Sequence, residues 1–334
     1  MKNGKLAESV LKRSVLKQLH SGRKGAGIWA DCALFSAPNG QILAWCAQEA
    51  AVAVQADSGE VELLFQKVAN NLATVGAKPV SAQITLMLPL DTEEPQVKEI
   101  MKHVAEAGEK TGMEIVGGDT NVSFAVKMPI MTVVGVGTMD EKRQGKLTGA
   151  KAGQDIVISK WIGLEGTTIL AKKYEEKLRK RYPAFLVETA KGFDQYLSVW
   201  DEAQIALENN VTQMHDMSQG GVLGALWELA EGAGLGLEVE LKRIPIRQET
   251  VEVCEVCGVN PYEMNGSGSM LMTSDDGEGL VAVLERAGIS ASVVGKLTDK
   301  QDRIIRNEEE VRFLDRPRGV DPIAELLYGQ TGQA

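Results

Sequence analysis

Apolar residues follow helical and strand-like periods in turn along this chain. They recur at helical spacing from Leu6 to Leu19, with lysines and arginines between them. A helical pattern also covers about Glu60 to Val75, and another begins after Asp91, where an acidic segment and Pro95 favour a helix start. The strand-like runs of this half are Ile28 to Phe35, Gln41 to Ala47, Val80 to Leu88, the run that ends in a Gly-Gly-Asp segment, and Val126 to Val136.

The second half shows the same mixture of periods. The stretch 140–146 is polar, contains a glycine and predicts a connector between domains, and a long helical region then runs to about residue 209. Strand candidates are Asp155 to Ser159, Val211 to Met214, Leu237 to Leu241 and Ser269 to Thr273, with helices between and after them. Because helices alternate with strands while Pro38-Asn39-Gly40 signals a hairpin, mixed α+β layers fit better than an all-parallel sheet.

Length and charge limit the classes of function. A chain of 334 residues exceeds the size at which one core stops growing, so we expect two domains, 1–145 and 146–334. The net charge of -10 without a long basic cluster argues against nucleic acid and acidic membrane surfaces as partners. No apolar run approaches the roughly eighteen residues of a membrane span, and the N-terminus leads into an amphipathic helix rather than a signal core. These features predict a cytoplasmic protein.

The segment 116–122, Val-Gly-Gly-Asp-Thr-Asn-Val, is the most informative motif. Glycines allow a tight turn and a close approach to a ligand, and a carboxylate just beyond a strand end can hold Mg²⁺ together with substrate phosphates. We therefore expect Asp119 to follow the end of its strand as a metal or phosphate ligand. An ordinary turn from a strand into a loop explains these residues equally well.

A second segment with similar chemistry runs from His215 and Asp216 to Gly220-Gly221. Ser218 is a good cap residue, and glycines in the first turn leave backbone amides accessible to an anion such as phosphate. The alternative is a capped helix with a tight turn. Two weaker glycine segments, 163–168 and 265–269, have the same two explanations, with a flexible loop favoured for the second.

Cysteine and histidine usage favours no metal or redox centre. The chain holds four cysteines, too few for a disulfide framework at this length. Cys254 and Cys257 form a lone CxxC in a helical pattern, and the three histidines supply no second ligand pair for zinc. We expect two buried small hydrophobic side chains there.

The ordered series of segments is similar to one superfamily over nearly the whole chain. It comprises Gly27-Ile28-Trp29-Ala30-Asp31-Cys32-Ala33-Leu34, Lys67-Val68-Ala69-Asn70-Asn71-Leu72-Ala73, Ala77-Lys78-Pro79, Gly117-Gly118-Asp119-Thr120, Gly163-Leu164-Glu165-Gly166-Thr167, His215-Asp216 with Gly220-Gly221, and the Gly-Ser-Gly loop before Met270. This series resembles the PurM-like superfamily of aminoimidazole ribonucleotide (AIR) synthase, thiamine-monophosphate kinase, selenophosphate synthetase and the hydrogenase-maturation protein HypE. The segment from His215 to Gly236, followed by Ile244-Pro245-Ile246-Arg247, looks closest to HypE.

The resemblance implies an N-terminal domain that forms a β-barrel across a homodimer and a C-terminal α/β sandwich domain. It also implies ATP with Mg²⁺, and phosphoryl transfer to an oxygen of a small-molecule substrate, in which the protein positions phosphates and neutralises charge. The implied metal ligands are Asp31 and Asp119, and the implied catalytic residues are Asp119, Asp216 and His215. The implied nucleotide-binding residues are Asp31, Asn70, Gly117, Gly118, Thr120, Arg23, Lys24, Gly220 and Gly221.

Several positions depart from the superfamily pattern. Ala30, Gln48 and Asn71 stand where members with full activity usually carry aspartates, and neutral side chains are poorer Mg²⁺ ligands. The chain ends in Gln333-Ala334 rather than in the cysteine that accepts a carbamoyl group in HypE, and the loop 21–25 has no cysteine of the selenophosphate synthetase type. Each named activity of the superfamily is therefore open for this chain.

Two functions follow from this comparison. One is a divergent ATP- and Mg²⁺-dependent enzyme that phosphorylates or activates an oxygen of a small molecule or maturation intermediate. The other is a catalytically degenerate dimeric scaffold that binds a nucleotide or another anion. A metal or redox protein built on the CxxC is a third, less favoured reading.

Overall fold

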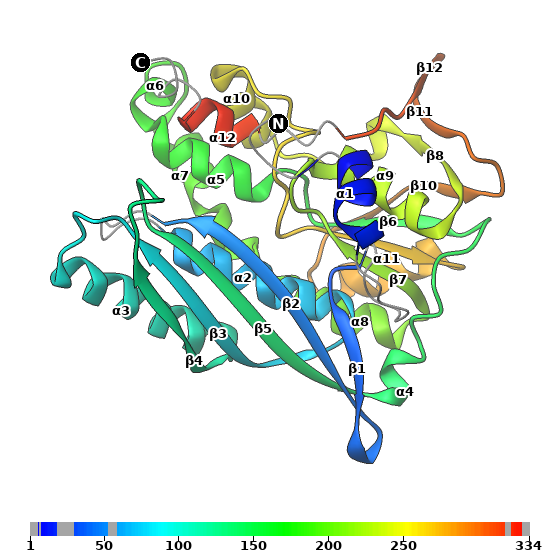
Figure 1. The fold of residues 1–334 in the computed structure, drawn as a ribbon. Coiled ribbons are helices and arrows are strands. Elements are labelled where there is room, and N and C mark those ends of the chain that lie inside the picture. Colours follow the sequence, from blue (N-terminus) through cyan, green and yellow to red (C-terminus); the bar gives the residue numbers. More distant parts are fainter. Residues whose placement is uncertain (1–5, 7, 19–29, 53–58, 318–321, 329–334) are drawn as a thin grey trace. The chain divides into compact units, whose positions relative to one another are not determined.

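The computed structural model describes residues 6, 8–18, 30–52, 59–317 and 322–328 (Figure 1). The chain divides into two compact units, one of residues Asp31–Gly145 and one of Lys146–Ala334 together with Met1–Ala30. The predicted division into domains 1–145 and 146–334 remains a prediction.

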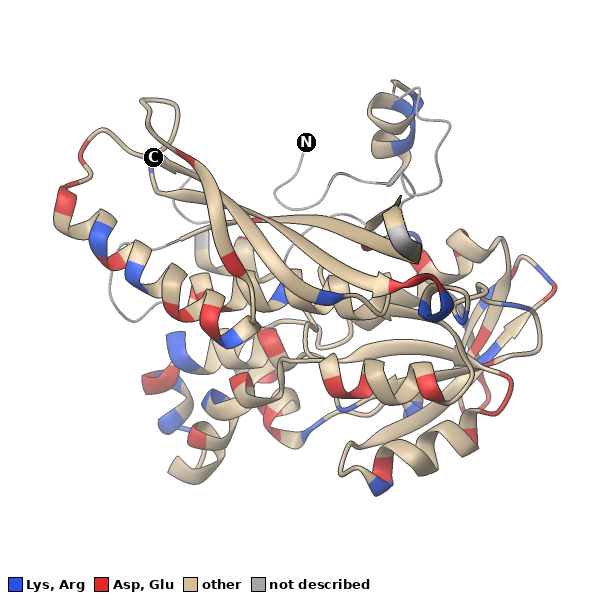
Figure 2. Cartoon of the chain, turned by 90° about the horizontal axis from the view of Figure 1, so that it is seen from below, with Lys and Arg blue, Asp and Glu red and all other residues tan. Residues whose placement is uncertain are grey.

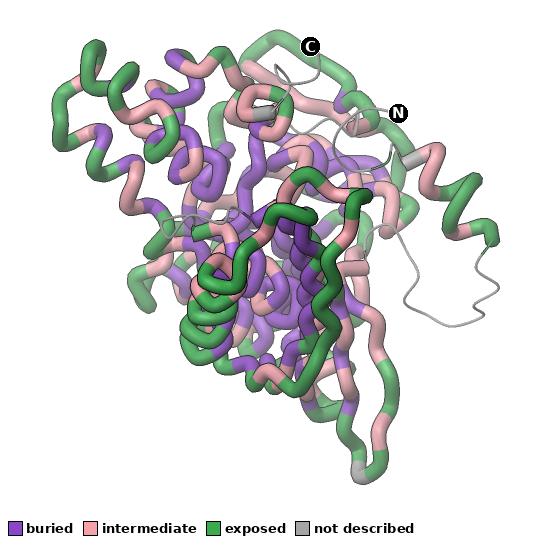
Figure 3. The backbone as a smooth tube through the Cα atoms, turned by 60° about the vertical axis from the view of Figure 1, so that its left-hand side comes forward, coloured by how far each residue is buried: buried purple, intermediate pink, exposed green. Residues whose placement is uncertain are grey.

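The unit Asp31–Gly145 consists of one mixed sheet with helices on one of its faces (Figure 1). In spatial order the strands are β1 (Ala33–Ala37), β2 (Gln41–Ala51), β5 (Ile130–Asp140), β3 (Lys78–Leu88) and β4 (Glu114–Val122). Helices α2 (Glu60–Thr74) and α3 (Glu94–Thr111) bury their apolar sides against it, and α4 (Glu141–Gln144) follows β5. Buried positions alternate with exposed ones along most of β3 and with half-buried ones along β5, as expected for strands with one well-covered face (Figure 3).

Local sequence explains how these elements begin and end. Helix α3 starts with a capping box, in which Glu93 and Gln96 satisfy each other's backbone N–H groups, and it ends at Gly112 in the left-handed conformation. The predicted hairpin at Pro38-Asn39-Gly40 is confirmed, because a single 3-10 turn joins β1 to β2 with Ala37 opposite Gln41.

The second unit contains a seven-stranded mixed sheet. Its spatial order is β12 (Glu310–Phe313), β11 (Arg303–Asn307), β8 (Gly236–Glu240), β10 (Ala291–Thr298), β6 (Asp155–Ser159), β9 (Met270–Ser274) and β7 (Val211–Asp216). The helices are α1 (Glu8–Ser14), α5 (Leu164–Lys173), α6 (Glu175–Arg179), α7 (Ala184–Lys191), α8 (Trp200–Glu208), α9 (Gly221–Ala233), α10 (Gln248–Cys257), α11 (Gly277–Arg286) and α12 (Pro322–Tyr328), with 3-10 turns η1 (Leu16–Gln18), η3 (Gly192–Tyr196) and η4 (Leu241–Arg243).

One expectation about the second unit is wrong in detail, and a second was incomplete. The long helical region before residue 209 is broken into α5, α6, α7, η3 and α8, because Pro183 and Gly192 interrupt it. Helices α11 and α12 follow β9 as expected, but three strands that were not expected, β10, β11 and β12, lie there too. The turn between β11 and β12 has Glu308 in the left-handed region, at φ +57°, which no glycine announces in the sequence.

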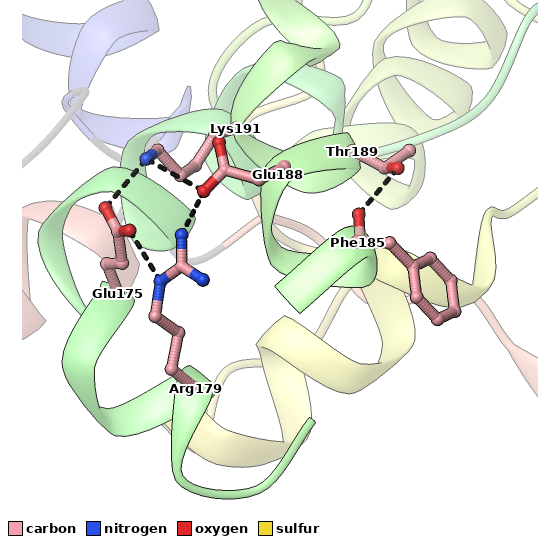
Figure 4. A network of polar contacts seen from close by, with 6 residues as sticks. All are labelled: Glu175, Arg179, Phe185, Glu188, Thr189 and Lys191. Carbon is pink, nitrogen blue, oxygen red and sulfur yellow. Dashed lines mark hydrogen bonds and ion pairs between the residues drawn. The ribbon is translucent and has the colours of Figure 1, made fainter. Parts of the chain in front are cut away.

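Ion pairs join neighbouring elements of the second unit at its surface. Helix α1 contacts α9 through Lys12 and Glu231, and Arg303 lies 2.6 Å from the same carboxylate, so these two cations lower the pKa of Glu231. Figure 4 shows a second network, in which Glu175 of α6 accepts from Arg179 at 2.7 Å and from Lys191 of α7 at 2.7 Å. Basic and acidic residues are interspersed along the drawn chain (Figure 2), and such exposed pairs contribute little stability each.

Candidate functional site

Asp119 lies inside β4 and not beyond its end, so the expected strand end is wrong. The strand continues because 120–122 pair with the last residues of β3, Asp119 itself lying opposite Thr85. Gly118 makes this possible: its φ is +155°, and an added Cβ would lie 1.9 Å from the carbonyl oxygen of Ile84. The exposed carboxylate of Asp119 accepts a hydrogen bond of 2.7 Å from Nδ2 of Asn121. The backbone therefore requires a glycine at 118 whether or not a ligand binds.

The sheet register shows how far Asp119 lies from Glu49, the carboxylate that follows Gln48 in the sequence. Glu49, Thr132, Thr85 and Asp119 form one row across four strands. Three strand spacings separate the ends of that row by about 14 Å, so Glu49 and Asp119 of one chain cannot share one ion. Asp31 precedes β1, which is at the opposite edge of the sheet from β4. Among the described residues, no group of three or more His, Cys, Asp or Glu is arranged to hold a metal.

These positions fit a Mg²⁺ ion that reaches the protein mainly through phosphate oxygens. Such an ion needs one or two carboxylates and takes its other ligands from the nucleotide and water. Asp31 or Asp119 can each supply one carboxylate, whereas the described residues do not form a cage of protein side chains alone.

The predicted nucleotide contact Asn70 and its neighbour Asn71 are buried on α2. Oδ1 of Asn70 accepts from Nε2 of Gln66 at 2.9 Å. The carbonyl oxygen of Asn71 accepts from the thiol of Cys32 at 3.0 Å and from the hydroxyl of Thr74 at 2.8 Å. The structure thus brings the segment that carries Asp31 and Cys32 onto α2 beside Asn71. Arg23 and Lys24 lie outside the described residues.

In the second unit, three loops with candidate residues meet at one edge of the sheet. Strand β9 is antiparallel to both β6 and β7, with Leu271 opposite Ile158 and Met270 opposite Asp216. The loops that follow β6 and β7 and the loop that precedes β9 therefore lie side by side. They are the three glycine segments at 163–168, 216–221 and 265–269.

Two predicted catalytic residues of this edge are deeply buried. Asp216 is 2% exposed at the end of β7. Nε2 of the adjacent His215 lies 3.1 Å from Oε2 of Glu228 on α9. This carboxylate, which orients the imidazole, was not predicted from the sequence, and its spacing of thirteen residues from His215 gave no signal.

Backbone carbonyls cover the two helix N-termini at this edge. The N–H of Gly221 donates to Ser218 O at 3.2 Å and that of Leu223 to Tyr262 O at 3.2 Å, while Gly166 of α5 donates to Asn265 O at 3.2 Å. The expectation that the first turn of α9 leaves its amides accessible is therefore wrong for Gly221 and Leu223. The segment 260–265 caps both helices, and its Asn-Pro start is the only sequence sign of a turn there.

The remaining side chains of this edge are polar and nearly all buried. Glu165 of α5 lies 3.4 Å from Nδ2 of Asn265, and Ser267 is fully buried. Behind them, Lys160 forms an ion pair of 2.7 Å with Glu202, and Arg247 stacks 4.8 Å from the ring of Trp161. An edge that offers carboxylate and amide oxygens is better suited to cations or N–H donors than to anions.

The CxxC has the expected buried side chain at Cys254, whereas Cys257 is only partly buried. It occupies the last turn of α10, where burial, and then the neighbouring Cys257, raise the pKa of Cys254 to about 12. Its Sγ lies 3.7 Å from the sulfur of Met264. A thiol with so high a pKa is a poor nucleophile and metal ligand, which supports the interpretation as a small hydrophobic side chain.

No helix in the described part of the chain is long and apolar enough to cross a membrane.

Comparisons with known proteins identify the family. The N-terminal domain of AIR synthase related proteins matches residues 30–139, and the C-terminal domain of the same proteins matches residues 151–306. A protein of Methanocaldococcus jannaschii, named for hydrogenase expression/formation, is 24% identical over 333 residues, which cover 97% of either chain. Carbamoyl dehydratase HypE of Rhodobacter capsulatus is 29% identical over 233 residues, 68% of this chain and 66% of that protein.

Solved structures share the fold. HypE in its complex with HypF has a TM-score of 0.71 at 19% identity, covering 92% of this chain and 100% of that one. HypE in complex with ATP has a TM-score of 0.69 at 17% identity, covering 94% and 96%. Two adjoining family models, a relative of matching length and a common two-unit fold agree, and the chain belongs to the AIR synthase related protein family, within the PurM-like superfamily that includes HypE.

Proposed function

We propose that this chain is a divergent ATP- and Mg²⁺-dependent enzyme that phosphorylates or activates an oxygen of a small molecule or of a maturation intermediate, in the cytoplasm. The observation that carries the proposal is the similarity along almost the whole chain to HypE, whose ATP complex has the same fold. Asp119 and Asp216, the carboxylates that the superfamily resemblance assigns to the reaction, are both present. For phosphoryl transfer, a protein mainly has to position the phosphates and neutralise their negative charge.

In this proposal the chain's own residues bind and orient rather than act as nucleophiles. Asp119 is exposed and its carboxylate is already oriented by Asn121, so it is available to a metal-bound phosphate. His215, whose Nε2 lies 3.1 Å from Oε2 of Glu228, would exchange a proton with a bound acceptor. When bound, ATP with Mg²⁺ would supply the transferable phosphoryl group.

Replacing Asp119 with asparagine tests this function. Asparagine keeps the shape but removes the charge, so we expect a loss of ATP turnover of about a hundredfold or more, the scale of one electrostatic contact in a transition state. The measurement is ADP release in the presence of Mg²⁺ and pooled small-molecule acceptors, beside calorimetric titration with ATP. Asp140→Asn, at the end of β5 in the same unit, is the matched control and is expected to retain activity.

The alternative is a dimeric scaffold that binds a nucleotide without turnover, and the neutral residues Ala30, Gln48 and Asn71 favour it. ATP binding that survives Asp119→Asn, with no ADP release from either protein, would establish the scaffold in place of the enzyme. Absence of any binding at millimolar ATP would exclude both.

The proposal includes a homodimer formed through the unit Asp31–Gly145. Its edge strand β4 exposes Val116 and Val122, and the exposed Phe124 follows it. An uncovered strand edge with exposed apolar side chains is a surface that proteins usually cover.

We expect Val122→Lys to convert the dimer to a monomer at micromolar concentration in sedimentation experiments, because a lysine would be buried in the interface. Val311→Lys is the matched control, since Val311 is an exposed valine on β12, the edge strand of the other sheet. A wild-type chain that sediments as a monomer, or an interface broken only by Val311→Lys, would contradict this assignment.

A further inference from the structure

The thiols of Cys32 and Cys46 are neighbours inside the unit Asp31–Gly145. Cys32 directly precedes β1, and the first pair of that strand joins Ala33 to Trp45, so Cys32 reaches β2 beside Cys46. The exposed fractions are 5% and 7%, and extending the antiparallel register by one residue puts Cys32 opposite Cys46. The four cysteines of the chain are all reduced in this structure.

Helix α2 holds both sulfurs in place. Sγ of Cys32 donates to the carbonyl oxygen of Asn71 at 3.0 Å, and Sγ of Cys46 donates to that of Val68 at 3.5 Å. These two carbonyls are three residues apart on one side of the helix. Residues that face each other on antiparallel strands have Cα atoms about 4.5–5.5 Å apart, which lies within the range of about 4.4–6.8 Å that a disulfide spans.

We propose that Cys32 and Cys46 are a modification site, a dithiol that a small disulfide of the glutathione class oxidises to an intrachain disulfide. One thiolate attacks the small disulfide and forms a mixed disulfide, and the first small thiol leaves. The second cysteine then displaces the second small thiol. The protein loses two protons and two electrons and gains one S–S bond, and the oxidant becomes two thiols.

Oxidation changes the contacts of α2. Both S–H donors are consumed, so Val68 O and Asn71 O lose the thiol hydrogen bonds, and Asn71 O keeps the hydroxyl of Thr74 at 2.8 Å. The consequence for nucleotide affinity rests on the proposed function, because only the superfamily resemblance places Asn70 beside the nucleotide. Formation of the disulfide itself does not depend on that function.

The test uses the full-length Cys254→Ser/Cys257→Ser variant, in which only these two thiols remain. The folded protein is incubated with excess oxidised glutathione at pH 8.5, quenched in acid, alkylated and mapped by mass spectrometry. We expect a peptide pair joined through Cys32 and Cys46 that lacks two hydrogens. Cys32→Ser and Cys46→Ser should each abolish it, and wild-type protein should give the same bond.

A second experiment shows whether the reagents can form this disulfide at all. The same variant unfolded in urea forms the disulfide readily if the reagents work. The folded protein is incubated for days at several ratios of oxidised to reduced glutathione. If both thiols can still be alkylated once each sample is unfolded, no disulfide has formed in the native arrangement and the proposal is wrong. Calorimetry with ATP on the reduced protein tests the proposed function separately, because formation of the disulfide does not depend on nucleotide binding.

Discussion

Replacing Gly221 with alanine is expected to lower the free energy of unfolding of the second unit by about 3 kcal/mol or more. Two costs combine: a left-handed backbone at φ +60° costs an alanine about 1–2 kcal/mol, and an overpacked contact adds about 1–3 kcal/mol. The added Cβ would lie 2.6 Å from the carbonyl oxygens of both Met264 and Tyr262. Neither oxygen can move freely, because the segment 260–265 caps both α5 and α9.

The opposite end of the same helix supplies the control. Gly234 follows α9 at φ +67°, but an added Cβ there meets nothing within 4 Å. Gly234→Ala should therefore lower the free energy of unfolding only by the cost of a left-handed alanine, about 1–2 kcal/mol. Urea unfolding combined with hydrogen-exchange mass spectrometry localises either loss to the second unit. Equal losses of unfolding free energy in the two variants would show that the contact with Tyr262 and Met264 adds nothing to the effect of Gly221→Ala.

The elements that the sequence predicted well are those with strong local signals. Pro38-Asn39-Gly40 gave the hairpin, and the acidic start and Pro95 gave α3, because turn and cap chemistry acts over a few residues. Strands β10 and β11 have partners that are distant in sequence, since β10 pairs with β6 and β8 and β11 pairs with β8. A strand whose stability comes from distant neighbours carries a weak local pattern.

The candidate site was predictable in its residue types but not in its geometry. The Gly-Gly-Asp segment was found, yet its strand continues past Asp119 because β3 is long enough to pair with residues 120–122. Glu228 and the capping carbonyls of Tyr262 and Asn265 act through tertiary contacts, and no spacing along the chain announces them. The paired thiols of Cys32 and Cys46 became visible only when the register of β1 on β2 was known.

Lys160 and Glu202 form the ion pair whose disruption should have the largest effect on stability. Their side chains are 9% and 3% exposed, and Nζ lies 2.7 Å from Oε1 of Glu202. The same ammonium group donates to Tyr196 O at 2.8 Å and to the carbonyl of Ser198. All three donors of the lysine are therefore used, and they join the end of β6 to the segment before α8. This segment packs on Gly268, so the pair also positions the loop 265–269.

Lys160→Met should lower the free energy of unfolding by about 3–5 kcal/mol, because it leaves the Glu202 carboxylate buried with the hydroxyl of Ser159, at 3.1 Å, as a remaining partner. Lys160→Met/Glu202→Leu should recover most of that loss, since burying two apolar side chains avoids the desolvation of a lone charge. Lys172→Met is the control: its ion pair with Asp194 has the similar distance of 2.9 Å but is exposed, so the loss should stay below about 1 kcal/mol. A double-mutant cycle from thermal unfolding gives the coupling energy. Additive losses for Lys160 and Glu202 would mean that the two charges act independently and that the pair does not hold this edge of the sheet together.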